Sequence, residues 1–197
     1  NGTVIDKLID SVIVSKDVNQ IDLIVGDKNA VLIATRILGY GADYKVTIGG
    51  EEHTIDLGKL ENKEFDESNL VNGKNEFNFT LPHSKTVLTY KILTGNDEKS
   101  IERELAGLKR LNKNNNPEMT TRLKYMILAV DGNEDKKTIR EFVDNGFLAR
   151  DARAFRNNLK TTSPDVDLSY LLDNGEEVEV SIGLSFFWPD FGDSIKS

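Results

Sequence analysis

The chain has 197 residues, and its 38 % hydrophobic content, 29 % charged content and net charge of −8 are those of a well-solvated globular protein with one large or two small domains. The absence of cysteine excludes disulfides, thiolate catalysis and cysteine-ligated zinc, and two histidines, His53 and His83, are too few for a histidine metal cage. No apolar run approaches the roughly 20 residues that span a bilayer, so we expect no membrane segment.

Two short helices are predicted at the amino end. Apolar residues recur at helical spacing over residues 3–14. A second helix is predicted to begin at the cap residue Asp27 and to end at Gly39 and Gly41, because glycine commonly follows the last turn of a helix.

Three β-hairpins are predicted from alternating side chains on either side of turn residues. The strands are expected at residues 44–48 and 53–57, 76–81 and 86–93, and 168–172 and 177–184. The first hairpin turns at Gly49 and Gly50. The third turns at Asn174-Gly175, a pair typical of a type I′ turn.

The middle of the chain is predicted to be helical. Helices are expected from residue 96 to 111, from Thr120 or Thr121 through Leu128, from Asp135 to Gly146, and over residues 148–160. The predicted fold class is α+β, with three hairpins packed against this helical segment and two helices at the amino end. We expect residues 1–93 and 94–197 to form one compact unit or two interlocked subdomains.

Motifs for common catalytic and cofactor-binding sites are absent from the sequence. Walker, GxSxG and HExxH patterns do not occur, and the dinucleotide and calcium-loop patterns fail at required positions. Asp165 and Asp167 share a face of an extended segment and could perform acid–base chemistry, as could His53, but no nucleophile signature accompanies them. A hydrolase is therefore the weaker alternative, and a solvated turn is the preferred reading of the aspartates.

Charge is unevenly distributed along the sequence. Residues 1–93 carry 10 basic and 14 acidic side chains, residues 94–160 carry 14 and 11, and residues 161–197 carry 1 and 8. The net negative charge disfavours nucleic acid as a partner, although the basic middle keeps that alternative open. Such asymmetry can direct a protein onto a charged partner.

A basic stripe is predicted on the helix at 148–160. At 100° per residue, four cations fall within about 120° of one face, beside an apolar face. The stripe consists of Arg150, Arg153, Arg156 and Lys160. It is either a solvated face with local ion pairs, for example to Asp151, or a docking surface for an acidic partner, since arginine binds carboxylates bidentately.

Aromatic residues gather near the carboxyl end. The group consists of Phe186, Phe187, Trp188 and Phe191. They either complete the core where the last strand ends or anchor a partner, because large aromatic side chains dominate both cores and the centres of interfaces. Something must cover them, since four exposed rings would promote aggregation.

Several runs of residues together resemble the baseplate hub subunits of T-even-like, contractile-tailed bacteriophages, over nearly the whole chain. The runs are Leu8–Ile9, Val25–Ala30 (VGDKNA), Arg36–Ala42 (RILGYGA), Leu93–Lys99 (LTGNDEK), Thr120–Leu123 (TTRL), Val130–Gly132 (VDG), Ile139–Asn145 (IREFVDN), Leu148–Ala154 (LARDARA), Pro164–Asp167 (PDVD), Gly175–Val180 (GEEVEV) and Phe186–Asp190 (FFWPD). Family members often carry paired cysteines in the two hairpins, as in a zinc-ribbon-like knuckle. Residues 49–52 and 173–175 hold no cysteine here, so metal binding is not carried over.

The resemblance implies a structural or assembly component of the tail that docks onto other proteins, with no enzymatic activity and no cofactor. The implied partners are other baseplate or tail proteins, with the tape measure as a further candidate, and an oligomer is left open. The implied location is the tail baseplate of the virion, or the host cytoplasm during assembly. The alternative function is a tail-assembly chaperone that is absent from the mature virion. No signal peptide is visible at the amino end. The missing initiator Met leads us to expect a fragment or a trimmed form.

Overall fold

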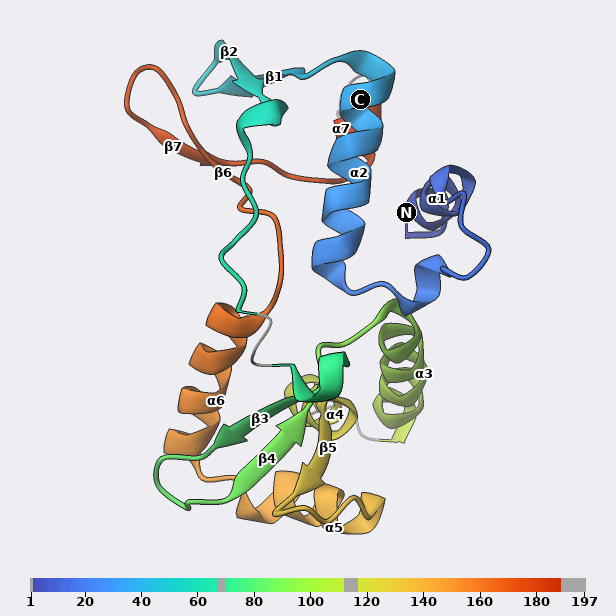
Figure 1. Ribbon diagram of the computed structural model, residues 1–197, viewed down its shortest axis with the longest axis vertical. Helices are drawn as coiled ribbons and strands as arrows, with labels where there is room; N and C mark the ends of the chain where they lie inside the picture. Colours follow the sequence, from blue (N-terminus) through green and yellow to red (C-terminus); the bar gives the residue numbers. More distant parts are fainter. Residues whose placement is uncertain (1, 67–69, 112–116, 189–197) are drawn as a thin grey trace. The chain divides into compact units, whose positions relative to one another are not determined.

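The computed structural model describes residues 2–66, 70–111 and 117–188, which fall into two compact units (Figure 1). Unit 1 contains residues 1–64 and 164–197, and unit 2 contains residues 65–163. Both combine helices and strands, which confirms the α+β class. The division differs from a boundary after residue 93, because the second hairpin pairs with a strand from beyond that point and the third hairpin packs with the amino-terminal elements.

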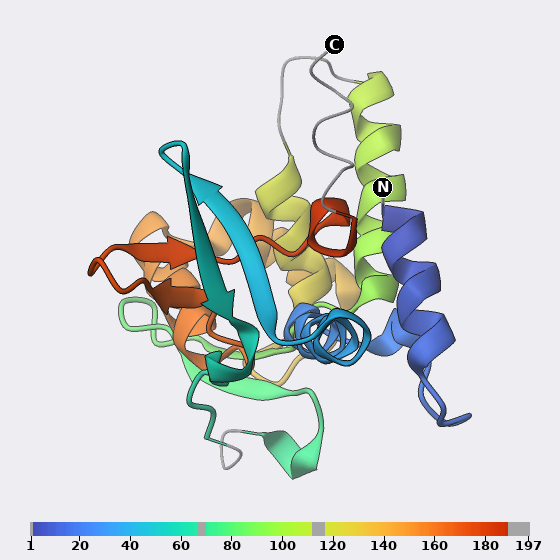
Figure 2. The same cartoon turned by 90° about the horizontal axis from the view of Figure 1, so that it is seen from above.

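Unit 1 combines two helices at the amino end with two hairpins. Its elements are α1 (Gly2–Val12), η1 (Gln20–Asp22), α2 (Val25–Tyr40), β1 (Asp43–Ile48), β2 (Glu51–Asp56), η2 (Leu57–Lys59), β6 (Ser169–Leu171), β7 (Glu177–Glu179) and α7 (Leu184–Phe187). Figure 2 looks along α2 and shows the β1–β2 hairpin extending away from it. The two predicted helices and the first and third hairpins are therefore confirmed. The predicted cap at Asp27 is wrong, because α2 already begins at Val25 after Ile24, which places Asp27 in the first turn of the helix.

The two hairpins of unit 1 turn differently. Gly49 and Gly50 both have positive φ angles, 60° and 92°, which makes the two-residue loop between β1 and β2 a type I′ turn. Between β6 and β7 only Gly175 has a positive φ angle, 84°, and its N–H bonds to the carbonyl of Leu172. The predicted type I′ turn at Asn174-Gly175 is therefore wrong, because the longer loop needs a left-handed residue only where it rejoins the strand.

The core of unit 1 joins segments from both ends of the sequence. Ile9 of α1, Leu32 of α2, Ile55 of β2 and Val180 are all buried within it. Residues 61–63 and 165–167 pair as short antiparallel segments, with bonds from Lys63 N–H to the Asp165 carbonyl (2.8 Å) and from Asp167 N–H to the Glu61 carbonyl (2.7 Å). These bonds close the unit where the chain leaves for unit 2 and returns.

Unit 2 is built on the antiparallel sheet β3-β4-β5 with helices around it (Figure 1). Its elements are η4 (Val71–Gly73), β3 (Phe77–Thr80), β4 (Val87–Tyr90), α3 (Gly95–Leu111), α4 (Glu118–Met126), β5 (Ile127–Val130), α5 (Lys136–Glu141), the π-turn η5 (Phe142–Gly146) and α6 (Ala149–Thr162). The helix predicted to run through Leu128 instead ends at Met126, and residues 127–130 form β5 against β4. A short apolar run has the same periodicity in a buried strand as in a helix, so pairing with β4 decides its conformation.

The core of unit 2 holds α6 against the sheet. Phe155 is fully buried, and its ring lies 5.0 Å from that of Tyr90 and 6.0 Å from those of Phe79 and Phe147, measured between centroids. The Tyr90 hydroxyl is 3.0 Å from Thr162 Oγ1 and accepts a bond of 2.7 Å from Asn158 Nδ2. These contacts fix which face of α6 is turned to solvent.

Candidate docking surface

All four cations of the predicted stripe are exposed on α6 and form what we call the α6 basic face: Arg150, Arg153, Arg156 and Lys160. At 100° per residue they lie opposite the inward positions of Phe155 and Asn158. Among the described residues of unit 2, none of the four makes an ion pair or a side-chain hydrogen bond. The face therefore presents four guanidinium or ammonium groups with unused donors.

Asp151 is the single acidic residue of α6, and it is turned away from the basic face. Its side chain is fully buried, and its two oxygens accept bonds from the backbone amides of His83 (2.8 Å) and Ser84 (3.0 Å) in the β3–β4 turn. The local ion pair between Asp151 and the stripe, considered from the sequence, is therefore absent. Asp151 precedes Phe155 by one helical turn, and that spacing was the available signal for its inward position.

Hydrogen bonding holds the pKa of Asp151 below its ordinary value of 3.8. Burial opposes ionisation, but the amides of His83 and Ser84, the Ser84 hydroxyl and the charge of His83 together outweigh it. Because the folded-state pKa is lowered, the carboxylate stabilises the fold fully above pH 3.8, and this contribution is lost as the pH falls through the lowered value.

We expect Asp151→Asn to lower the melting temperature by several degrees at pH 7, because an amide replaces one acceptor oxygen with a donor aimed at a backbone N–H. Thermal unfolding followed by circular dichroism at a series of pH values is the measurement. The difference from the unaltered chain should shrink as the pH falls below 3.8 and through the lowered pKa of the folded-state carboxyl of Asp151. Parallel curves over the whole range would contradict this role.

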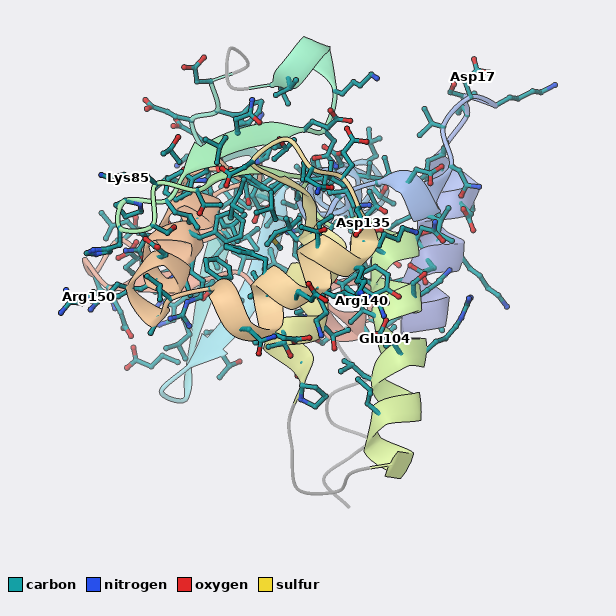
Figure 3. The ribbon with its side chains drawn as sticks, turned by 90° about the horizontal axis from the view of Figure 1, so that it is seen from below. Asp17, Lys85, Glu104, Asp135, Arg140 and Arg150 are labelled. Atoms are coloured by element: carbon teal, nitrogen blue, oxygen red, sulfur yellow. The ribbon has the colours of Figure 1, made fainter. Side chains whose placement is uncertain are left out.

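The β3–β4 turn places further basic groups beside the amino end of α6. Asp151 binds this turn, so Lys85 and the exposed His83 lie near Arg150, and Figure 3 shows Lys85 and Arg150 on the same side of unit 2. Unit 2 has 17 basic and 14 acidic residues, and unit 1 has 8 and 19, so their net charges are +3 and −11. The sequence pattern had not revealed that the turn contributes to this surface, because the link depends on a buried carboxylate.

The position of Arg150 argues that the basic face does not serve the stability of the helix. Arg150 lies in the first turn of α6, where the helix dipole repels cations and favours anions. Asp151, in the same turn, has the favourable charge. A cation that the helix itself disfavours, and that makes no ion pair with the described residues of its unit, is typical of a surface used for recognition.

The aromatic group at the carboxyl end divides between core and surface. Phe186 and Phe187 are buried in the core of unit 1, whereas Trp188 is 42 % exposed, and Phe191 lies outside the described residues. The buried Arg36 guanidinium binds the Phe186 carbonyl through Nε at 3.0 Å. Phe186 and Phe187 therefore complete the core and are unavailable as partner anchors, which leaves Trp188 as the exposed ring of the described part of the group.

The candidate acid–base residues form structural contacts in unit 1. Asp165 Oδ1 accepts a bond of 3.0 Å from Asn29 Nδ2, and Asp167 Oδ1 accepts one of 2.6 Å from the Ser169 hydroxyl. That hydroxyl and the Ser169 amide hold the pKa of Asp167 below its ordinary value. Both aspartates line a hollow of about 360 Å³, but His53, on β2, does not. The three groups are therefore not assembled into one site.

A second hollow of about 360 Å³ lies in unit 2, where charged groups engage one another. Lys91 Nζ is 2.7 Å from Asp97 Oδ1, and Arg140 lies 4.0 Å from Glu104, the residue that it faces in Figure 3. Tyr125 also donates to Glu104, at 3.0 Å. Three cations of the hollow, Lys91, Lys124 and Arg140, are thus matched by carboxylates, whereas Lys136 makes no ion pair among the described residues.

Comparisons with protein-family models, with curated proteins and with solved structures find no match to this chain. Within residues 2–66, 70–111 and 117–188, no helix is long and apolar enough to cross a membrane. In the same ranges, no three histidine, aspartate or glutamate side chains are arranged to hold a metal ion.

Proposed function

We propose that the chain is a structural or assembly component of the baseplate hub of a contractile phage tail, and that it acts by docking its α6 basic face onto an acidic protein surface. The sequence resemblance supports the assignment to the tail baseplate, and the α6 basic face supports the proposal that the chain acts by docking. The implied location is the tail baseplate, or the host cytoplasm during assembly.

One observation carries the docking mode: four exposed cations share a helix face while the single acid of that helix is buried beneath it. A solvated helix usually intersperses charges of both signs, which gives weak local pairs. Here the sign is uniform, and arginine supplies three of the four groups. Its planar fork can bind a carboxylate through two parallel hydrogen bonds.

We expect replacement of Arg150, Arg153 and Arg156 by glutamate to abolish co-purification of the chain with baseplate proteins from phage-infected cells. The fold should survive, because exposed substitutions usually change the free energy of unfolding by no more than about 0.5 kcal/mol each. Melting curves check the fold, and mass spectrometry of the purified complex checks the partners.

A matched control reverses three exposed cations elsewhere in unit 2: Arg103→Glu on α3, with Lys136→Glu and Lys137→Glu on α5. The control changes the net charge by the same amount and should retain the partners. Equal loss in both variants would mean that total charge decides binding. Equal retention would mean that the α6 basic face is only solvated.

The chaperone alternative predicts the same loss of binding but a different final location. Mass spectrometry of purified virions separates the two functions, because a hub component should be present at a stoichiometry comparable to that of other hub proteins. A chain found in assembling tails but missing from finished particles would favour the chaperone.

A further inference from the structure

We infer that the partner of the α6 basic face is a second copy of this chain, which presents the outer face of its β6–β7 hairpin. This inference rests on the docking role proposed above and names the partner surface. The carboxylates of this hairpin are a second set of charges that make no ion pair with the described residues of their own unit.

One face of the β6–β7 hairpin packs against the core of unit 1, and the other face is exposed to solvent. Tyr170 and Val178 pack against the core of unit 1. On the other face, Leu171 pairs with Glu177 and Ser169 pairs with Glu179, and all four residues are exposed. Both strand carboxylates therefore point outward from the same side of the hairpin.

The exposed carboxylates of this hairpin make no ion pair among the described residues, and Lys63, which lines the same hollow as Glu177 and Glu179, is paired with Asp165 at 3.6 Å. Asp173, Glu176, Glu177 and Glu179 make no ion pair among the described residues of unit 1, and residues 164–179 contain no lysine or arginine. The β1–β2 hairpin of the same unit differs, because Lys45 Nζ lies 2.8 Å from Glu52 Oε1 across its strands. An ion pair can therefore form across a hairpin of this unit, but none forms across the strands of β6–β7.

The two surfaces match in sign, and their spacings differ by an amount that long side chains can bridge. Residues two apart on a strand, such as Glu177 and Glu179, lie about 7 Å apart along it. Residues three apart on a helix, such as Arg153 and Arg156, rise by about 4.5 Å and are separated further by their angle on the helix. Long arginine side chains can span the remaining difference and meet carboxylates bidentately.

The outer face of the hairpin also carries an exposed leucine beside its charges. Leu171 on β6 is 67 % exposed and pairs with Glu177 across the two strands. An apolar contact surrounded by charge pairs is the usual make-up of a specific protein–protein interface. Because helix and hairpin are different surfaces, each copy would retain one free surface of each kind, and the contact would propagate into a ring or a filament.

The test uses the purified full chain, with self-association measured by sedimentation velocity. The unaltered chain should associate at about 50 mM salt, with affinity falling by about tenfold or more at about 500 mM salt, since salt screens charge pairs between surfaces. A helix-reversed variant carries Arg150→Glu, Arg153→Glu and Arg156→Glu. A hairpin-reversed variant carries Glu176→Lys, Glu177→Lys and Glu179→Lys. Each variant alone should be monomeric at either salt concentration.

Mixing the two reversed variants should restore association, because each then offers the charge that the other lacks. Both remain net negative, so attraction between total charges cannot produce the recovery. Matched controls reverse charge elsewhere: Arg103→Glu, Lys136→Glu and Lys137→Glu in unit 2, and Asp10→Lys, Asp17→Lys and Asp22→Lys in unit 1. Both controls should associate as the unaltered chain does.

A purified chain that stays monomeric at low salt would overturn the inference, as would reversed variants that associate normally or whose mixture fails to recover. Co-purification from infected cells reports separately on the proposed function. If helix reversal abolishes that co-purification while the purified chain is monomeric, the second-copy inference is wrong and the docking role stands.

Discussion

Replacing Gly26 with alanine should destabilise unit 1 by about 3 kcal/mol, as expected for a group forced into a filled site. A methyl group at this position of α2 would overlap the carbonyl oxygen of Pro164 and lie 2.8 Å from the Cα of Asp165. Both obstacles are backbone atoms, so no side-chain rotation relieves the overlap. The helix must move away from the 164–165 segment.

That movement would break the contacts that close unit 1. Asn29 Nδ2 would separate from Asp165 Oδ1, now 3.0 Å away, and the bond between Lys63 N–H and the Asp165 carbonyl would be strained. Urea unfolding gives the loss of stability, and hydrogen exchange should show reduced protection near Lys63. Exchange that increases only in unit 2 would contradict this explanation.

Gly39→Ala is the matched control for this change. Gly39 lies in the last turns of the same helix, and an added methyl group there meets no atom within 4 Å. Alanine should therefore raise stability by about 0.5–1 kcal/mol, because it restricts the unfolded chain and favours the helix. Opposite signs at two glycines of one helix would separate the backbone contact from helix propensity. An unchanged Gly26→Ala variant would show that the 164–165 segment is free to shift.

The contact at Gly26 illustrates what the sequence predicts and what it does not. Local patterns predicted both amino-terminal helices, the hairpins and α6, because turn residues, caps and periodicity act over a few neighbours. The closure of unit 1 by residues 61–63 and 165–167 has no such local signature. It depends on backbone pairing between segments about 100 residues apart, and the division into units follows from it.

Ambiguous apolar runs account for the errors in individual elements. Residues 127–130 suit a helix or a buried strand equally well until β4 is available as a partner. The strand predicted through Leu184 ends at Glu179, and residues 184–187 form the single turn α7, which directs Phe186 and Phe187 into the core. A cluster of aromatic residues in a sequence does not reveal which rings face inward, because that depends on packing against distant elements.

The candidate site was predicted in part. Helical periodicity was sufficient to gather the α6 basic face on one side, since all four members belong to one helix. Asp151 was considered from the sequence as a local partner of the stripe, but its actual partners in the β3–β4 turn are 67 and 68 residues away in the sequence. The sequence could therefore predict the charge of the surface, but not the burial of the acid that leaves this charge unmatched.

Replacing Phe155 with alanine should destabilise unit 2 by about 3–5 kcal/mol, which is the usual cost of removing a buried phenylalanine ring. The ring is fully buried and contacts those of Phe79, Tyr90 and Phe147. Its loss would leave a cavity at the point where α6 packs on the sheet. Urea unfolding monitored by circular dichroism is the measurement.

Phe155→Ala should also weaken docking, because the α6 basic face keeps its geometry only while the inner face of the helix is packed. The matched control is Arg156→Ala, one residue further along on the outer face, where the side chain is exposed and makes no hydrogen bond or ion pair with the described residues of unit 2. That control should change unfolding by less than about 0.5 kcal/mol and yet reduce partner binding. Together the two variants assign stability to the apolar face of α6 and recognition to its basic face. Equal stability losses would contradict the division, because Arg156 would then be part of the packing that holds the helix on the sheet.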